Sequence, residues 1–406
     1  MDISLFQAPD CEKRTICAVC RHPLPDPLIE LPSLPLTDIL VREPVQEAVG
    51  FVDQTFHLCK ECGHGQLGTL ISPKVLYGSA YSLRTSGSRG ARGANDRFLQ
   101  FIRGITGRRD FEAIVEIGSN DLYLLSQLRS WLEMPHQGHR LIGIDPLLEG
   151  REAEFPNFRV IGQFFEDADI DSLHNTLVVT SHVLEHLRDP RAFLERLLEK
   201  ADETTLFAFQ FPTLEPLVRN LRFDQIYHHH LHYFSRASFT YLLNRLGCEI
   251  VGTQTDTQYW GALMVAFRKG GQEVVQLIPA EDIPAEDIEE AYLIFSDRMN
   301  SITSTLEWVL AGAARVVAYG ASLQLPVLDY HLHHAMIYIE SVIDDDEGKW
   351  GMYYLYLPQP IKGPKEISQR QWPDMIVLIT AIGFSRGILQ KLIPLNPRRI
   401  ITPLDI

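Results

Sequence analysis

From residue 112 onward the chain alternates apolar, strand-length runs with helical stretches. The apolar runs lie at 113–117, 140–144, 158–161, 176–180 and 204–209, and the helical patterns at 121–132 and 190–200. Parallel strands need crossover connections, usually helices, so this alternation is typical of a parallel sheet covered by helices. The sequence therefore predicts a Rossmann-like α/β domain in the middle of the chain.

The two ends of the chain differ from this middle part. Near the C-terminus, RVVAY at 315–319 is followed by Gly-Ala-Ser, which predicts a second Rossmann-like α/β domain over 312–406. Acidic helical repeats predict a helical linker over 271–311, whereas residues 1–75 carry many Pro and Leu residues and little helical periodicity. A chain of 406 residues with 45% hydrophobic content has enough apolar material for two or three cores.

Four of the six cysteines form two CxxC pairs, Cys17 with Cys20 and Cys59 with Cys62. Two such pairs can close a tetrahedron of thiolates around zinc, with Zn–S distances of about 2.3 Å. A redox CxxC normally occurs once and opens a helix, so a structural zinc site is the better interpretation. We expect residues 1–75 to form a loop-rich zinc-binding module in which the metal takes the place of a core.

The first predicted strand ends in a glycine turn that suggests a cofactor site. AIVEIGSNDL at 113–122 places Glu116 near the strand end and Gly118 in the turn, and Asp145 ends the next strand, LIGID. A carboxylate at that second strand end accepts the ribose hydroxyls of a nucleotide. The GSND turn lacks the spacing of a dinucleotide fingerprint, and Leu122 stands where many methyltransferases have another glycine.

Together with LVVTSHVLEHLRDP at 177–190, these runs match the motif order of class I S-adenosylmethionine (SAM) dependent methyltransferases. The residues that we expect to bind SAM are Glu116, Gly118, Asn120, Asp121, Asp145, Phe164 and Ser181.

A histidine-rich segment follows the last predicted strand of this domain. FDQIYHHHLHYFS at 223–235 contains Tyr227, His228, His229, His230 and His232. Three interpretations are open: a metal site, a catalytic acid–base group, and aromatic packing between a strand and a helix. Histidine is the natural base for removing a proton next to a ketone, or from a hydroxyl, near pH 7.

The order of these motifs resembles the sugar C-methyltransferase family, whose members methylate nucleotide-linked ketosugars. The resemblance is carried by 59–66 (CKECGHGQ), 80–88 (AYSLRTSGS), 116–125 (EIGSNDLYLL), 227–235 (YHHHLHYFS) and 318–323 (AYGASL). In the family the histidine segment reads Tyr-His-Glu-His, and its last histidine is taken as the base. By this match Tyr227 corresponds to the tyrosine, His229 replaces the glutamate and His230 corresponds to the base.

Two further positions match active-site residues of the family. His186 stands where the family has another active-site histidine, and Tyr81 matches a tyrosine that reaches the sugar, while Leu83 replaces a second tyrosine. The loop 258–264 departs from the family's His-Gly-Gly-Ser-Leu-Arg pattern. The catalytic set that the resemblance implies is therefore His230, His229, Tyr227, His186 and Tyr81.

The resemblance implies a zinc-binding module (1–75), a SAM-dependent methyltransferase domain (76–270), the helical linker (271–311) and the C-terminal Rossmann-like domain (312–406). Its cofactors would be SAM and a structural zinc, and its substrate a nucleoside diphosphate (NDP) sugar on a path to a deoxysugar or polysaccharide. An O- or N-methyltransferase and a non-catalytic scaffold protein are the alternatives.

Charge and composition argue against other partners. The net charge of −15 repels a phosphate backbone, and the basic cluster Arg84, Arg89, Arg92 and Arg97 could equally serve nucleotide phosphates. The apolar runs are well short of the roughly 20 residues of a membrane span, and residues 1–10 lack the layout of a signal peptide. We expect a cytoplasmic protein with neither a nucleic acid nor a membrane partner.

Overall fold

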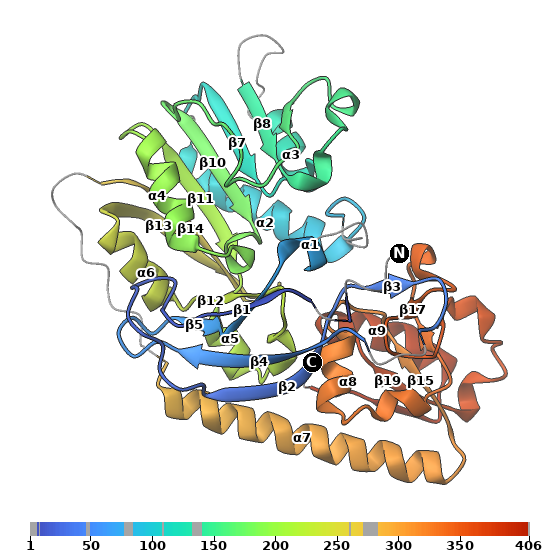
Figure 1. The fold of residues 1–406 in the computed structure, drawn as a ribbon. Helices are drawn as coiled ribbons and strands as arrows, with labels where there is room; N and C mark the ends of the chain where they lie inside the picture. Colours follow the sequence, from blue (N-terminus) through green and yellow to red (C-terminus); the bar gives the residue numbers. More distant parts are fainter. Residues whose placement is uncertain are drawn as a thin grey trace.

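The computed structural model describes residues 6–7, 9–45, 49–76, 84–107, 109–131, 140–259, 261–270 and 283–404. Figure 1 shows a large sheet at the top, a smaller sheet at the lower right, an N-terminal sheet between them and the long helix α7 (Ala285–Ala311) along the bottom. None of the described helices combines the length and the apolar composition that crossing a bilayer requires.

The large sheet has seven strands in the order β13-β14-β11-β10-β7-β8-β9. The strands are β7 (Ala113–Ile117), β8 (Arg140–Ile144), β9 (Arg159–Ile161), β10 (Thr176–Ser181), β11 (Leu206–Phe211), β13 (Cys248–Asp256) and β14 (Ala262–Lys269). The five from β9 to β11 are parallel, as the sequence predicts, and β14 and β13 extend the sheet with antiparallel pairs. The chain returns from β9 to β10, beside β7, so the sheet switches direction between β7 and β10.

Helices cover both faces of this sheet. They are α2 (Arg89–Thr106), α3 (Tyr123–Trp131), α4 (Pro190–Lys200) and α6 (Arg236–Arg245), with α5 (Leu214–Arg219) and α1 (Pro73–Leu76) at its lower edge. Phe98 of α2 and Leu125 of α3 pack on one face against Ile114, whereas α4 and α6 pack on the other. This layering confirms the class I SAM methyltransferase fold, and it places the carboxyl ends of β7, β8 and β10 together where such folds bind nucleotides.

The C-terminal sheet has five parallel strands in the order β18-β16-β15-β19-β20. Its elements are β15 (Arg315–Tyr319), β16 (Val342–Ile343), β18 (Ile361–Lys362), β19 (Met375–Ile379) and β20 (Arg399–Ile401), with α8 (Leu325–His331) and α9 (Ser385–Leu392). This sheet, too, switches direction beside its first strand, β15, as a Rossmann-like domain does.

The N-terminal part is more ordered than the predicted loop-rich module. Besides β1 (Cys11–Lys13) and β6 (Thr69–Ile71), it has a four-stranded sheet of β2 (Ile29–Pro35), β4 (Phe51–Leu58), β5 (Gly65–Leu67) and β12 (His232–Tyr233). The fourth strand comes from the histidine-rich segment, with Tyr233 beside Gly65. Leu31, Leu34 and Phe56 are fully buried, so the sheet has an apolar core that the sequence reasoning missed.

Helix α7 is more than the linker that the sequence predicts. Its residues Ile288, Phe295 and Leu306 are completely buried, in a single core that also contains residues of the N-terminal sheet and of the C-terminal domain. The short strand β17 (Tyr353–Tyr354) of the C-terminal domain also pairs with β3 (Leu40–Val41) of the N-terminal part. Because the three parts pack together in this way, the residues that line the spaces between them are held in place.

Candidate active site

A pocket of about 410 Å³ opens at the carboxyl ends of β7, β8 and β10. Gly118, with φ of +71°, makes the turn that lets the backbone line the pocket, and a Cβ at this position would lie 2.2 Å from Val183. Leu122 has φ of +61°, the left-handed conformation that glycine favours. Leu122, which stands where many methyltransferases have glycine, therefore has the left-handed backbone conformation that glycine would adopt.

Asp145 lies in the wall of this pocket at the end of β8. Its Oδ2 accepts a hydrogen bond from the Asn120 backbone N–H and its Oδ1 one from Leu147 N–H, both at 2.8 Å. Burial raises the pKa of Asp145, and these two donors act in the opposite direction. The carboxylate is thus held rigidly, with acceptor capacity left for ligand hydroxyls.

The structure divides the predicted SAM residues into two groups. Gly118, Asn120, Asp145, Phe164 and Ser181 line the pocket. Glu116 and Asp121 instead support the turn: Glu116 accepts from Leu125 N–H at 2.9 Å, and Asp121 accepts from Ser86 N–H at 2.9 Å. Burial raises the pKa of Glu116 well above its usual value, as expected for a carboxyl group enclosed by the fold.

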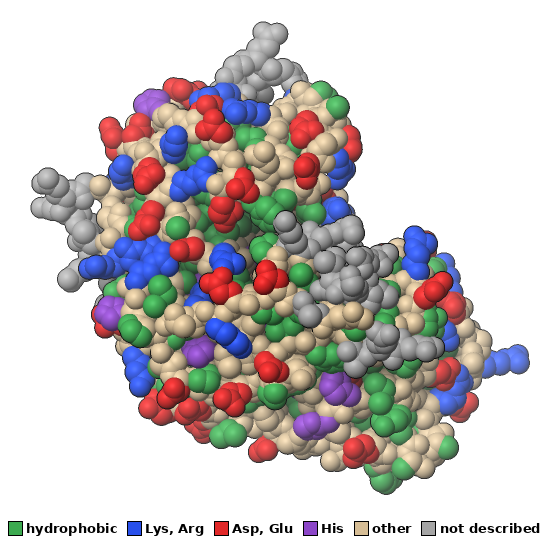
Figure 2. All heavy atoms as spheres, viewed as in Figure 1, with side chains coloured by type: hydrophobic (Ala, Val, Ile, Leu, Met, Phe, Trp, Pro, Cys, Tyr) green, Lys and Arg blue, Asp and Glu red, His purple; other side chains and the backbone are tan. Residues whose placement is uncertain are grey.

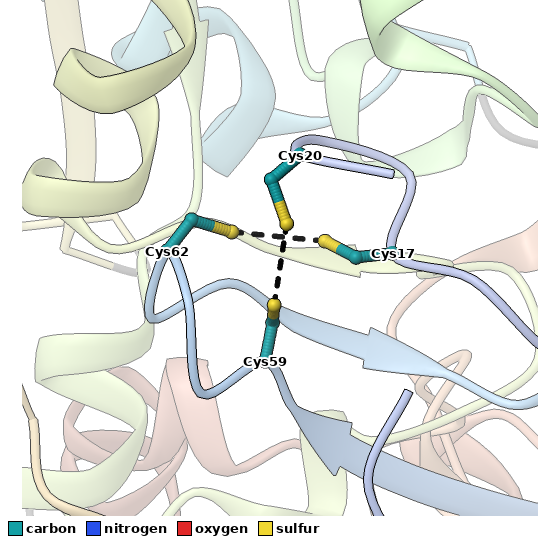
Figure 3. A group of neighbouring side chains, drawn as sticks. All are labelled: Cys17, Cys20, Cys59 and Cys62. Carbon is teal, nitrogen blue, oxygen red and sulfur yellow. Dashed lines mark hydrogen bonds between the residues drawn. The ribbon is translucent and has the colours of Figure 1, made fainter. Parts of the chain in front are cut away.

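The four paired cysteines converge in the N-terminal part, as Figure 3 shows. The Sγ atoms of Cys17 and Cys62 are 3.6 Å apart and those of Cys20 and Cys59 3.4 Å apart. A tetrahedral Zn–S₄ centre needs edges of about 3.8 Å, which small adjustments would provide. The four thiols fit a structural zinc ion and leave no ligand position for a substrate.

Most of the clustered histidines fasten their segment to the N-terminal part. His228 contacts Gln54 and the Leu34 carbonyl, and His232 contacts His64 at 2.9 Å. His229 contacts Thr37 Oγ1 at 3.1 Å and the Leu76 carbonyl at 3.3 Å. Burial lowers the pKa of His228 to about 4 and that of His229 to about 3, so both are neutral links in the packing.

His230 differs from its neighbours because it faces other predicted active-site residues. Its Nε2 lies 2.8 Å from the Tyr227 hydroxyl, and its ring lies edge-on to that of His186 at 5.0 Å. His186 donates from Nδ1 to the His229 carbonyl at 2.7 Å and lines the pocket at the ends of β7, β8 and β10. The structure therefore brings together His230, Tyr227 and His186, while Tyr81 lies outside the described residues.

Glu185 is a residue of this cluster that sequence reasoning missed. Its side chain is only 1% exposed, and its Oε2 has no hydrogen-bond partner among the described residues. Glu185, His186 and His230 have atoms within 4.8 Å of one another. Glu185 thus adds a carboxylate to both the metal-site and the acid–base interpretation of the histidine segment. The sequence feature that could have pointed to Glu185 was the VLEH turn.

A second, larger cleft of about 930 Å³ shares Tyr259 with the pocket that Asp145 lines. Four arginines line it: Arg219 at the end of α5, Arg222 after α5, Arg298 of α7 and Arg386 of α9. Tyr259 lines both spaces, and burial raises its pKa to about 12, so its hydroxyl stays protonated. The face of the molecule in Figure 2 has acidic and basic side chains interspersed, whereas this cleft concentrates positive charge.

Comparisons with known proteins agree with this geometry. Residues 89–253 match the family model described as "Methyltransferase domain", and residues 17–77 match the one described as "Putative zinc binding domain". The "C-methyltransferase NovU" of Streptomyces niveus is 27% identical over 262 residues. That alignment covers 61% of this chain and only 59% of the relative.

Solved methyltransferase structures are also similar to part of this chain. N-methyltransferase NodS from Bradyrhizobium japonicum WM9 is 15% identical over 44% of this chain and 97% of that chain, with a TM-score of 0.34. A SAM-dependent methyltransferase from Aquifex aeolicus is 12% identical over 42% of this chain and 89% of that chain, also with a TM-score of 0.34. On its sheet order, its glycine turn and the two matched family models, the chain contains a class I SAM-dependent methyltransferase domain preceded by a zinc-binding domain.

Proposed function

We propose that this protein transfers the methyl group of SAM to a carbon atom of a nucleotide-linked ketosugar. The observation that carries the proposal is the arginine-lined cleft, which meets the SAM pocket at Tyr259. Arginine binds phosphate oxygens through paired N–H donors, so Arg219, Arg298 and Arg386 suit the diphosphate of an NDP-sugar, whereas Arg222 is held by Asp224 through Nε and Nη2. With the diphosphate in this cleft, the sugar would extend toward the pocket wall that holds His186.

His230 is the proposed base. Burial, together with the nearby His186, His182 and His229, lowers its pKa well below the usual value, so the ring is neutral and able to accept a proton at pH 7. Tyr227, 2.8 Å away, orients the imidazole. We assign His186 to the wall that positions the sugar, and His229 to a positioning role because both its ring nitrogens contact the N-terminal part.

The reaction at carbon requires one proton to leave the position next to the carbonyl. His230 takes that proton, the C–H electron pair forms a carbon–carbon double bond, and the carbonyl oxygen becomes an enediolate oxygen. Bound SAM supplies an electrophilic methyl group and leaves as S-adenosylhomocysteine. The new carbon–methyl bond then forms while the carbonyl is restored, so no oxidant or reductant is needed.

The test is His230→Gln, assayed with NDP-ketosugars for methyl transfer and for incorporation of solvent deuterium next to the carbonyl. A positioned base contributes about 10²–10⁴-fold, so kcat and deuterium incorporation should fall by that order. SAM affinity should stay within a few fold, because His230 does not line the SAM pocket. His229→Gln should cost less than His230→Gln.

Three outcomes would contradict the proposal. Equal or greater loss in His229→Gln would make His229 the base. Methyl groups recovered on oxygen or nitrogen, with no deuterium incorporated at carbon, would favour the O- or N-transfer alternative. Activity that depends on an added divalent ion, and is lost in Glu185→Gln, would favour a metal site at Glu185, His186 and His230.

A further inference from the structure

His182 and Glu185 form a histidine–carboxylate pair in the wall of the SAM pocket. His182 Nδ1 lies 3.1 Å from Glu185 Oε1, and the Glu185 carboxylate is almost wholly buried. A ring nitrogen that faces a carboxylate carries its proton, so this contact fixes the orientation of the imidazole. His182 Nε2, the opposite nitrogen, has no hydrogen-bond partner among the described residues.

The backbone holds His182 in an unfavourable conformation to achieve this contact. His182 directly follows β10 and has φ of +56°, in the left-handed region that side chains other than glycine seldom adopt. Its N–H donates to the Gln210 carbonyl at 2.8 Å, and its ring lies edge-on to Tyr259 at 5.4 Å. The strain places the ring beside the residue that lines both the SAM pocket and the arginine-lined cleft.

We propose that His182, oriented by Glu185, donates a hydrogen bond from Nε2 to the substrate oxygen that becomes negative during methyl transfer. This inference rests on the proposed function, because it supplies the group that the enediolate oxygen needs. Donation from Nε2 requires a proton on each ring nitrogen, and the Glu185 carboxylate lies beside Nδ1 to accept the hydrogen bond from that side. His182 is then a catalytic residue and Glu185 a positioning residue.

The two histidines would divide the chemistry between them. His182 would donate to the substrate oxygen from one side, while His230 takes the proton from carbon. No net proton is gained or lost at His182, because the enediolate oxygen returns to a carbonyl when the methyl group is attached. His182 lines the pocket, and its buried Nε2 has no partner among the described residues, as expected of a donor whose acceptor is a bound substrate.

The decisive variant is His182→Gly, since glycine suits the positive φ and the backbone can stay in place. Loss of one oxyanion donor costs about 10²–10³-fold in kcat, and SAM affinity should change by no more than about threefold. Added imidazole should restore part of the activity, which a purely structural role would not allow. Glu185→Gln should lose about 10–100-fold in kcat.

His174→Gln is the matched control, because His174 pairs with Asp202 at 2.5 Å in the same way but on the surface. Its activity should equal that of the wild type. A His182→Gly enzyme within threefold of wild-type kcat, or one with reduced kcat that imidazole leaves unchanged, overturns the assignment.

A second measurement is independent of turnover. Nitrogen-15 NMR of the wild-type protein should show a proton on His182 Nδ1 in a strong hydrogen bond that disappears in Glu185→Gln. Its absence in the wild type would overturn the pair even if ketosugars are methylated. Its presence in a protein that methylates no ketosugar would support the pair and reject the proposed function instead.

Discussion

The methyltransferase sheet and the C-terminal sheet contain the same turn, but the described residues around the two turns differ. Gly118 N–H bonds to the Ile144 carbonyl at 2.8 Å, and Gly320 N–H bonds to the Ile343 carbonyl at 2.7 Å. Asp145 accepts from the Asn120 N–H at 2.8 Å, and Asp344 accepts from the Ala321 N–H at 2.6 Å. In each sheet the first strand, its glycine turn and an acid at the end of the next strand form one hydrogen-bonded unit.

The difference lies in what covers the turn. At Gly118 the turn faces the pocket of about 410 Å³. At Gly320 the chain covers its own turn: Lys349 Nζ donates to the Ala321 carbonyl at 2.8 Å, and the Tyr354 hydroxyl donates to the Ser322 carbonyl at 2.8 Å. A Rossmann-like backbone is therefore insufficient for a cofactor site, since the residues over the turn decide whether it is open.

Replacing the two acids should give the largest contrast between the sheets. Asp145→Ala removes a buried, rigid acceptor from the pocket, and SAM binding should weaken by about 1.5–3 kcal/mol, or about ten- to a hundredfold. Asp344→Ala should leave SAM affinity within twofold. Calorimetry of both variants, with a wild-type stoichiometry of one SAM per chain, is the measurement; two SAM per chain, or equal losses in both variants, would contradict the comparison.

The sequence was sufficient for the parts of this comparison that follow from local patterns. Strand and helix alternation, the glycine turn at Gly118 and the acid at Asp145 are encoded in contiguous runs, and so are the two CxxC pairs. The side-chain contacts that cover the Gly320 turn could not be predicted, because Lys349 reaches Ala321 from a separate segment.

The histidine segment shows the same limit on prediction from sequence. Nothing in the order of its residues says that His228 and His229 face the N-terminal part while His230 faces His186. Glu185 was visible in the VLEH turn, but its burial beside His182 results from the tertiary packing of that turn. Side-chain direction in an irregular segment depends on contacts with distant elements, which a local pattern does not contain.

The two glycines should respond differently to alanine, with an effect of intermediate size. A Cβ at Gly320 would lie 2.3 Å from the Ala381 Cβ and 2.7 Å from its backbone nitrogen, and φ there is +110°. Gly320→Ala should therefore lower the free energy of unfolding by about 2 kcal/mol, with SAM affinity unchanged in the folded protein. In Gly118→Ala the three heavy atoms nearest to the new Cβ belong to the Val183 side chain in the pocket wall, so this variant should chiefly weaken SAM binding. Urea unfolding and calorimetry on both variants test this. A loss of SAM affinity in Gly320→Ala, with a loss of stability alone in Gly118→Ala, would contradict the comparison.

Lys349→Met should have the smallest effect, and it tests directly whether the Lys349 contact closes the Gly320 turn to cofactor. The ammonium group contacts the Ala321 carbonyl at 2.8 Å and Asp344 Oδ1 at 3.9 Å, and the side chain is 25% exposed. Such a partly exposed contact contributes up to about 1 kcal/mol, so the free energy of unfolding should fall by no more than that. Methionine is one heavy atom shorter than lysine and keeps most of the unbranched apolar chain while it removes the charge and its donors. If the C-terminal turn is closed to cofactor, SAM affinity and stoichiometry should be identical in Lys349→Met and in the wild type.

A second SAM equivalent bound by Lys349→Met would show that this one ammonium group is all that separates the two turns. A fivefold change in the affinity of the single site would show instead that SAM contacts the C-terminal domain.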